Sequence, residues 1–210
     1  MGEIPCQLIQ DELSPYGIAP DEVQCRSINS YISLLLRWNL QVSLTTVTDP
    51  IEVLRFHFGE SLYATVCVPI LNGRLADVGS GAGFPALPLR LFSPDLALIM
   101  IESNAKKAAF LREVIRQLGF SGAEVIRERM EKVPESADPF DFITARALGN
   151  HAGLLEWSRK QLAASGRLVL WLGEEDVAKI STDKRWKWQD PAHIPGSKRR
   201  FVLSGLPYSR

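Results

Sequence analysis

A short glycine-rich segment, Leu75–Pro85, constrains this chain more than any other part of it. An apolar run that contains Asp77 is followed by glycines at alternate positions, which are Gly79, Gly81 and Gly83. Such a run is typical of a buried parallel strand, and glycine allows the next turn to take a positive φ and to bring backbone close to a ligand. A helix that opens behind the turn offers unpaired N–H groups and the positive end of its dipole. The segment therefore predicts a cofactor cradle.

The spacing of these glycines separates two classes of cofactor. The dinucleotide fingerprint G-x-G-x-x-G, begun at Gly79, requires a glycine at position 84, where this chain has Phe84. The pattern G-x-G-x-G after an acidic residue instead suits an adenosyl-sulfonium ligand. A dinucleotide-dependent oxidoreductase is therefore an alternative that Phe84 disfavours.

Bulk properties fit a globular protein with one α/β core. A chain of 210 residues is long enough for such a core and a small appendage, and no apolar stretch approaches the ~20 residues that cross a bilayer. The N-terminal residues lack the pattern of a signal peptide. Three cysteines, Cys6, Cys25 and Cys67, form no C-x-x-C pair, so we expect reduced thiols and a cytoplasmic protein. The scattered histidines suggest no metal site.

The order of apolar patterns after residue 73 is typical of a parallel α/β protein. The expected strands are 75–78, 96–101, 124–126, 140–145 and 166–171. The expected helices are 87–91, 105–118 and 150–162. Segments 186–189 and 200–203 are expected to form an antiparallel pair across the loop between them.

The N-terminal part of the chain has helical patterns instead. One apolar stripe runs through residues 20–39, with Pro20 suited to the first helical position. A second helix is expected from Asp49-Pro50 to about Phe58. Neither helix can bury its stripe alone. We therefore expect residues 1–72 to be a helical extension that packs on a core of residues 73–210.

Two acidic residues lie where the ligand of a doubly wound sheet binds, beyond the carboxyl ends of the strands. Glu102 ends the second strand, where its carboxylate can accept both hydroxyls of a ribose; the alternative is a surface acid that pairs with Lys106. Asp77 ends the first strand, where it can order the glycine loop or face an ammonium group. Both are candidate cofactor-binding residues.

Two further segments point into the same crevice. Met130 and Glu131 follow the third strand, where the adenine edge of a bound nucleoside lies; the alternative is an ordinary loop of mixed charge. Arg146 ends the fourth strand, where its guanidinium can bind a phosphate or a cofactor carboxylate through two hydrogen bonds. The alternative for Arg146 is a strand-end residue that caps a helix.

Longer motifs in the chain resemble the RsmG (GidB) family of bacterial methyltransferases, from about residue 22 to the C-terminus. The matching segments are W-N-L-Q-V-S-L-T-T-V-T-D-P (38–50), R-F-H-F-G-E-S-L (55–62), D-V-G-S-G-A-G-F-P-A-L-P-L (77–89), I-E-S-N-A-K-K-A-A-F-L (101–111) and T-A-R-A-L (144–148). The long glycine segment with its F-P-x-L-P-L continuation is far more specific than G-x-G-x-G alone.

The resemblance implies a class I methyltransferase (Rossmann-like) fold, with a mostly parallel, seven-stranded sheet. It also implies S-adenosylmethionine as methyl donor and N7 of a guanosine in 16S ribosomal RNA as acceptor, on RNA or a small-subunit particle, and a cytoplasmic monomer. Carried over by position, the implied cofactor contacts are Gly79, Phe84, Met130, Glu131 and Arg146. Glu102 takes the family's acidic position after the second strand. No catalytic residue is implied.

The chain departs from the family pattern after the fifth strand. The family usually has a lysine followed by a glycine there, whereas this chain has Trp171-Leu172-Gly173 and then the acids Glu174, Glu175 and Asp176. Alternatives therefore stay open. One is a methyltransferase that acts on another RNA or on a small molecule, and another is a binding protein that keeps the cofactor fold without turnover.

The distribution of charge fits an anionic partner. Residues 1–72 hold three basic and eight acidic side chains, whereas residues 73–210 hold 21 and 16. Salt-sensitive contacts with RNA phosphates are expected from basic residues in two places, which are Lys106, Lys107, Arg112 and Arg116 on one helix, and Lys198, Arg199 and Arg200 near the C-terminus. The alternative for each is a solubilising charge. His57 is expected to pack in the interior rather than to stack on a flipped base.

Overall fold

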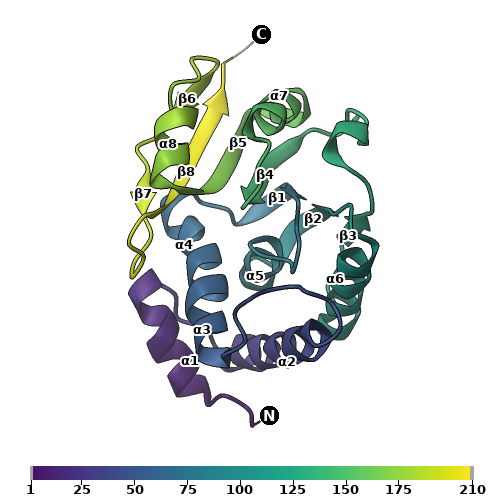
Figure 1. Ribbon diagram of the computed structural model, residues 1–210, viewed down its shortest axis with the longest axis vertical. Coiled ribbons are helices and arrows are strands. Elements are labelled where there is room, and N and C mark those ends of the chain that lie inside the picture. The colour runs from purple at the N-terminus through teal and green to yellow at the C-terminus, as the bar shows by residue number, and fades with distance from the viewer. Residues whose placement is uncertain (1, 209–210) are drawn as a thin grey trace.

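The computed structural model describes residues 2–208 of the chain. Its central sheet has the strand order β3-β2-β1-β4-β5-β8-β6, and β7 pairs with β8 beside this path (Figure 1). The strands are β1 (Asn72–Val78), β2 (Asp95–Ile101), β3 (Ala123–Ile126), β4 (Phe140–Arg146), β5 (Leu162–Gly173), β6 (Trp186–Trp188), β7 (Ala192–His193) and β8 (Arg200–Pro207). The expected α/β fold is confirmed, with a two-residue strand added to the seven on the main path.

The sheet is parallel from β3 to β5, and only β8 runs in the opposite direction to its neighbours. The central strand β1 pairs with β2 on one side and with β4 on the other. Val78, the last residue of β1, is in register with Ile101 of β2 and with Ala145 of β4. Three strands therefore end at the same edge of the sheet, and this edge carries the site described below.

Helices cover both faces of the sheet. They are α1 (Cys6–Leu13), α2 (Glu22–Asn39), α3 (Pro50–Val53), α4 (Glu60–Cys67), α5 (Ala86–Phe92), α6 (Ala105–Leu118), α7 (His151–Gln161) and α8 (Glu174–Ile180), with 3₁₀-helices η1 (Ser14–Tyr16) and η3 (Met130–Lys132) and the π-helix η2 (Leu54–Gly59). Helices α1 to α6 share one apolar cluster with the sheet, and α7 and α8 share the other (Figure 1). Within residues 2–208, no helix is long and apolar enough to cross a membrane.

Alternation along β5 divides these two clusters. Leu168 and Leu170 belong to the cluster under α7 and α8, whereas Val169 and Trp171 belong to the cluster under the other helices. Successive side chains of a strand point to opposite faces, so an apolar run such as this is buried on both sides. On the first of these faces, α5 contacts the sheet directly, and the N-terminal helices α2 and α4 pack on α5, with α2 also against α6. The division of the chain at residues 72 and 73 stays a prediction.

The first N-terminal helix ends at Asn39 and the second begins at Pro50 after the Asp49 cap, as expected, but their other ends differ from the prediction. Helix α2 begins at Glu22, because Asp21 caps it and forms a reciprocal capping box with Gln24; Pro20 precedes the helix. The helix that begins at Pro50 does not end near Phe58. It continues through the π turn of η2 into α4, because no residue there interrupts the helical backbone. Helices α1 and α8 were not expected.

The expected antiparallel pair near the C-terminus is present with another register. Strand β6 pairs with the end of β8, so that Trp186 faces Pro207 and Trp188 faces Gly205. The beginning of β8 pairs instead with β5 and β7. One edge of β8 pairs with β5, and β6 and β7 occupy different parts of its other edge.

The expectation of three reduced cysteines is wrong for two of them. Cys6 and Cys25 form a disulfide, and Cys67 has a free thiol. Helix α1 folds back along α2, which brings the Cα atoms of the pair to 5.4 Å despite a sequence separation of 19 residues. A spacing rule for adjacent cysteines does not detect such a pair.

Helix α2 also supports the glycine loop. The buried hydroxyl of Tyr31 donates to the carbonyl of Ala82 at 2.5 Å. Gly83 has a φ of +88°, and a Cβ there would lie 2.3 Å from Leu87 Cδ1 and 2.5 Å from the Tyr31 oxygen. The loop conformation therefore requires a glycine at this position.

We expect Gly83→Ala to lower the free energy of unfolding by about 2–5 kcal/mol, from left-handed backbone strain and overpacking together. Gly122→Ala is a matched control, because Gly122 has a φ of +71° with no atom near its absent Cβ. It should cost only the strain of about 1–2 kcal/mol. Urea unfolding of both variants measures the difference, and equal losses would contradict the packing of Tyr31 and Leu87 against Gly83.

Candidate active site

The glycine loop leaves β1 in a left-handed conformation. Gly79, Gly81 and Gly83 have φ angles of +72°, +56° and +88°, a region in which residues with a Cβ are strained. The N–H groups of Gly79 and Ser80 both donate to the carbonyl of Ile101, at 2.9 and 3.3 Å. The loop is therefore attached to the end of β2.

Glu102 makes a second attachment. Its carboxylate is 7% exposed and accepts hydrogen bonds from the N–H of Gly81 at 2.8 Å and from the N–H of Asn104 at 2.7 Å. Each oxygen accepts one backbone bond and retains a second lone pair. Glu102 is thus a buried acid that holds the loop, not a surface acid beside Lys106.

Four of the predicted cofactor residues line one cavity at the carboxyl edge of the sheet. Gly79, Glu102, Met130 and Glu131 come from the ends of three strands, and Met130 is 6% exposed. The cavity has a volume of about 190 Å³, and its remaining walls are formed by Val78, Ile101, Ser103, Glu128, Arg129, Leu148 and Asn150. Leu148 and Asn150 were not predicted, because nothing in the order of the sequence places the segment after β4 beside the segment after β3.

Asp77 lies behind the loop and is 1% exposed. Thr144 of the neighbouring strand β4 donates to Asp77 Oδ1 at 2.6 Å, whereas Oδ2 has no hydrogen-bond partner within residues 2–208. Burial raises the pKa of the Asp77 carboxyl from 3.8 to about 6, although the bond from Thr144 acts in the opposite direction. A buried carboxylate with an unpaired oxygen lowers the free energy of unfolding. Residues whose pKa is strongly shifted in this way are common at functional sites.

Gly83, within the loop, and Phe84, which follows it, do not line that cavity. The ring of Phe84 stacks on Tyr31 at 5.2 Å between centroids, and His57 lies 4.7 Å from it. His57 accepts or donates a 2.7 Å hydrogen bond with Thr45 Oγ1. Burial and the Arg146 guanidinium lower the pKa of His57 to about 4. His57 is therefore a neutral, packed residue at neutral pH, as expected.

Arg146 lines a second and larger cavity, of about 540 Å³. Its Nη2 donates to the carbonyl of Phe56 at 2.8 Å and to Glu60 Oε2 at 3.0 Å. Leu148 lines both cavities, so they adjoin at this residue. Arg146 thus lines only the larger cavity and is separated from Glu102 and Met130, with which it was predicted to share a crevice.

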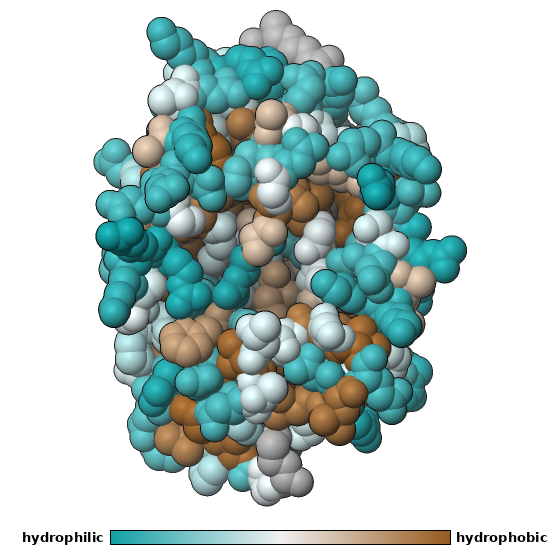
Figure 2. Space-filling model, in the orientation of Figure 1, coloured by the Kyte–Doolittle hydropathy of each residue, from teal (hydrophilic) through white to brown (hydrophobic). Residues whose placement is uncertain are grey.

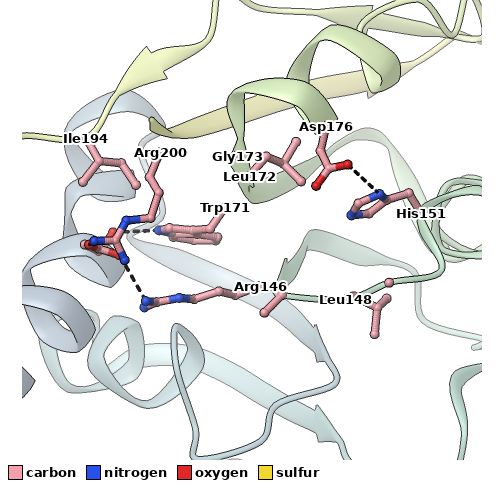
Figure 3. Close-up of a pocket in the computed structure, with 12 residues that line it drawn as sticks. Arg146, Leu148, His151, Trp171, Leu172, Gly173, Asp176, Ile194 and Arg200 are labelled. Carbon is pink, nitrogen blue, oxygen red and sulfur yellow. Dashed lines mark hydrogen bonds and ion pairs between the residues drawn. The ribbon is translucent and has the colours of Figure 1, made fainter. Parts of the chain in front are cut away.

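The walls of the larger cavity carry opposite charges on opposite sides (Figure 3). On one side, Glu60 pairs with Arg146 and with Arg200 Nη2, the latter at 2.7 Å, and its carbonyl accepts from the indole of Trp171 at 2.7 Å. On the other side, His151 Nδ1 lies 3.9 Å from Asp176 Oδ1. Burial raises the pKa of Glu60, and both guanidiniums counteract this.

The position of Glu60 could not be read from the sequence. The family pattern marks it only as the acid before Ser61, and it lies 86 residues before its partner Arg146. The residues of this cavity come from α4, β4, α7, β5, α8 and β8, and the face of the molecule seen in Figure 2 is hollowed near its centre. Within residues 2–208, no cluster of His, Cys, Asp and Glu is arranged to hold a metal ion.

The raised pKa of Asp77 predicts a pH-dependent stability. The folded protein binds a proton more tightly than the unfolded chain between pH 3.8 and about 6, so the stability should fall as the pH rises through this window. We expect the stability of the wild type relative to Asp77→Asn to be about 2–3 kcal/mol lower at pH 7 than at pH 4. Chemical denaturation across this range measures it; His57 titrates in both proteins, so its contribution cancels. A constant difference would contradict the burial of an ionised Asp77.

Comparisons with known proteins agree with this geometry. A model of the family described as rRNA small subunit methyltransferase G, or GidB, matches residues 24–195. Ribosomal RNA small subunit methyltransferase G of Xanthomonas campestris pv. campestris strain 8004 is 38% identical over 178 residues, which are 82% of each chain. The protein of the same description from Xylella fastidiosa is 39% identical over 188 residues, or 87% of each chain.

Solved structures show the same fold at lower identity. The crystal structure of a SAM-dependent methyltransferase from Aquifex aeolicus superposes with a TM-score of 0.60 at 18% identity, and the match covers 76% of this chain and 99% of that one. The sheet order, the glycine loop at the carboxyl edge and the matched residues 24–195 lead to one conclusion. This chain belongs to the rRNA small subunit methyltransferase G (GidB) family.

Proposed function

We propose that this protein transfers the methyl group of S-adenosylmethionine to N7 of a guanosine in 16S ribosomal RNA. The observation that carries the proposal is the family match over residues 24–195. Its physical support is the pair of adjoining cavities at the carboxyl edge of the sheet, one beside the glycine loop and one beyond Arg146. One cavity suits the donor and the other suits the acceptor.

The residues around the smaller cavity fit the donor. Gly79 offers backbone without a side chain, and a Cβ there would lie 3.1 Å from Leu148 Cδ1 in the opposite wall. Glu102 retains acceptor capacity for ribose hydroxyls, while Met130 and Glu131 border the region proposed for the adenine ring. When bound, the cofactor supplies a methyl group on a positively charged sulfur.

The other candidate residues are proposed to act from behind the loop or at its open end. Gly81 and Gly83 adopt the left-handed conformation of the turn. The ring of Phe84 stacks on Tyr31 and so anchors the turn to α2. The unpaired Oδ2 of Asp77 is the natural partner for an ammonium group. Arg146, in the wall of the larger cavity, is the proposed contact for the cofactor carboxylate.

The acceptor chemistry requires no catalytic dyad. N7 of guanine has an in-plane lone pair and carries no proton, so no general base is required. The task of the chain is to hold the ring in line with the methyl group, and such positioning is worth up to ~7–11 kcal/mol. Trp171, Leu172 and Ile194 give the larger cavity the apolar walls that suit a base.

The predicted RNA-binding residues have different surroundings. Arg112 donates to the carbonyl of Val125, Arg116 pairs with Glu113 at 2.6 Å, and Arg199 lies 3.7 Å from Glu174. Lys106, Lys107 and Lys198 make no ion pair within the described part of the chain, and we propose them as phosphate contacts.

We infer that the enzyme acts as a monomer and in the cytoplasm, where its proposed substrate is assembled. The inference about location rests on the substrate and not on cysteine usage, since the Cys6–Cys25 disulfide is unusual for that compartment. A second candidate acceptor is another RNA or a small molecule. It is favoured by Asp176, an acid that lines the acceptor cavity just after β5.

We expect Gly79→Val to abolish binding of S-adenosylmethionine. A branched side chain at a φ of +72° would strain the loop and approach Leu148 across the cavity. Gly122→Val is the matched control, since Gly122 has a similar φ of +71° in open space. Titration calorimetry with S-adenosylmethionine and with NAD measures both. Retained affinity in Gly79→Val would place the donor elsewhere, and tight binding of NAD alone would refute the methyltransferase.

Expression of this protein in a bacterial strain that lacks 7-methylguanosine in its 16S RNA should restore the modification. Mass mapping of the small-subunit RNA locates the methylated nucleotide, and Gly79→Val is the inactive control. Methylation of purified 16S RNA and of small-subunit particles, compared in vitro, identifies the form that is recognised. Unmodified RNA in cells that contain the folded, cofactor-binding protein would refute the acceptor.

A further inference from the structure

Glu60 is the least accessible charged residue of the larger cavity and connects three of its walls. Its side chain is 2% exposed. Oε2 accepts from Arg146 of β4 at 3.0 Å, Oε1 forms an ion pair with Arg200 Nη2 of β8 at 2.7 Å, and the main-chain oxygen accepts from Trp171 of β5 at 2.7 Å. A buried carboxylate is stable only with such partners.

The cluster carries one positive charge in excess, because two guanidiniums share a single carboxylate. The side chain of Arg146 is 17% exposed and its Nη1 is buried without a hydrogen-bond partner within residues 2–208. The side chain of Arg200 is 44% exposed. Arg200 is therefore the more accessible of the two cations.

Arg200 is also held in place from two directions. Glu60 binds one end of its guanidinium, and the ring of Phe56 lies 5.5 Å below its central carbon. A flexible arginine loses side-chain entropy when it binds a ligand, and an arginine that is already held loses less. The opposite wall of the cavity carries Asp176. An anionic group is thus directed toward the side of Arg200 (Figure 3).

We propose that Glu60 is a positioning residue that presents Arg200 to a phosphate of the acceptor nucleotide. The base would enter between Trp171, Leu172 and Ile194, and the backbone phosphate would remain at the mouth, where Arg200 is partly exposed. The planar guanidinium matches phosphate oxygens with two parallel hydrogen bonds. This inference rests on the proposed function, since it requires a nucleotide acceptor.

The test uses the full-length protein with the RNA form that the wild type methylates. Arg200→Gln should raise KM for RNA by about tenfold, a factor typical of a lost charge-assisted contact, and leave the Kd of S-adenosylmethionine unchanged. The slope of log affinity for RNA against log salt should fall by about one. Glu60 keeps Arg146 as its partner in this variant, so no buried charge is left alone and the fold should persist.

Glu60→Gln should raise KM for RNA by a similar factor, and the double variant Glu60→Gln, Arg200→Gln should be no worse than either single variant. Glu60→Asp keeps the charge and should recover most of the loss. Lys198→Gln is the matched control, because this neighbouring cation makes no ion pair with Glu60. Its effect should add to that of Glu60→Gln.

Three results would overturn the proposal. They are an unchanged KM and salt slope in folded Arg200→Gln, additive effects of Glu60→Gln and Arg200→Gln, and a loss in Glu60→Gln that Glu60→Asp does not recover. If Glu60→Gln does not fold, the comparison of Arg200→Gln with Glu60→Asp decides, because a positioning role requires a raised KM in the first and near-normal KM in the second. Failure of the proposed function itself is distinct: the wild type would then methylate no RNA.

Discussion

The structure of the site depends on the attachment of one left-handed loop to its surroundings on two sides. On one side the N–H of Gly81 donates to the buried carboxylate of Glu102 at 2.8 Å. On the other side the hydroxyl of Tyr31 donates to the carbonyl of Ala82 at 2.5 Å. A glycine loop has high conformational entropy when it is free, so these bonds determine whether a rigid cradle exists. The first comes from the neighbouring strand and the second from the N-terminal helices.

The N-terminal helices therefore contribute directly to the site. They provide Tyr31 under the glycine loop, His57 against Phe84, and Glu60 between Arg146 and Arg200. The π-helix η2 contains His57 and ends just before Glu60, so these two residues do not have the spacing of a regular α-helix. Such irregular turns occur frequently at functional sites. Without these helices the larger cavity would lack Glu60, and the glycine loop would lose the bond from Tyr31.

Much of the fold followed from local patterns. The helix at 105–118 has the predicted bounds: Gly119 ends it with a left-handed residue, and the structure shows that Asn104 caps its start. The helix after Pro50 was predicted to end too early, since nothing in its sequence signals continuation through a π turn. The Cys6–Cys25 disulfide and the register of β8 were mispredicted because each depends on segments that meet only after folding.

The sequence by itself determined the class of the donor site. Its signals are local: alternate glycines follow an acidic strand end, and an acid ends the next strand. Local backbone geometry at such glycines forms the loop that can bind a cofactor. The structure placed Gly79, Glu102, Met130 and Glu131 around one cavity. Only the tertiary structure decided the larger cavity, which we propose for the acceptor. Glu60, Trp171 and Arg200 lie far apart in the chain, and their contact depends on which strands are neighbours in the sheet and on how the N-terminal helices pack against it. No periodicity or spacing carries that information.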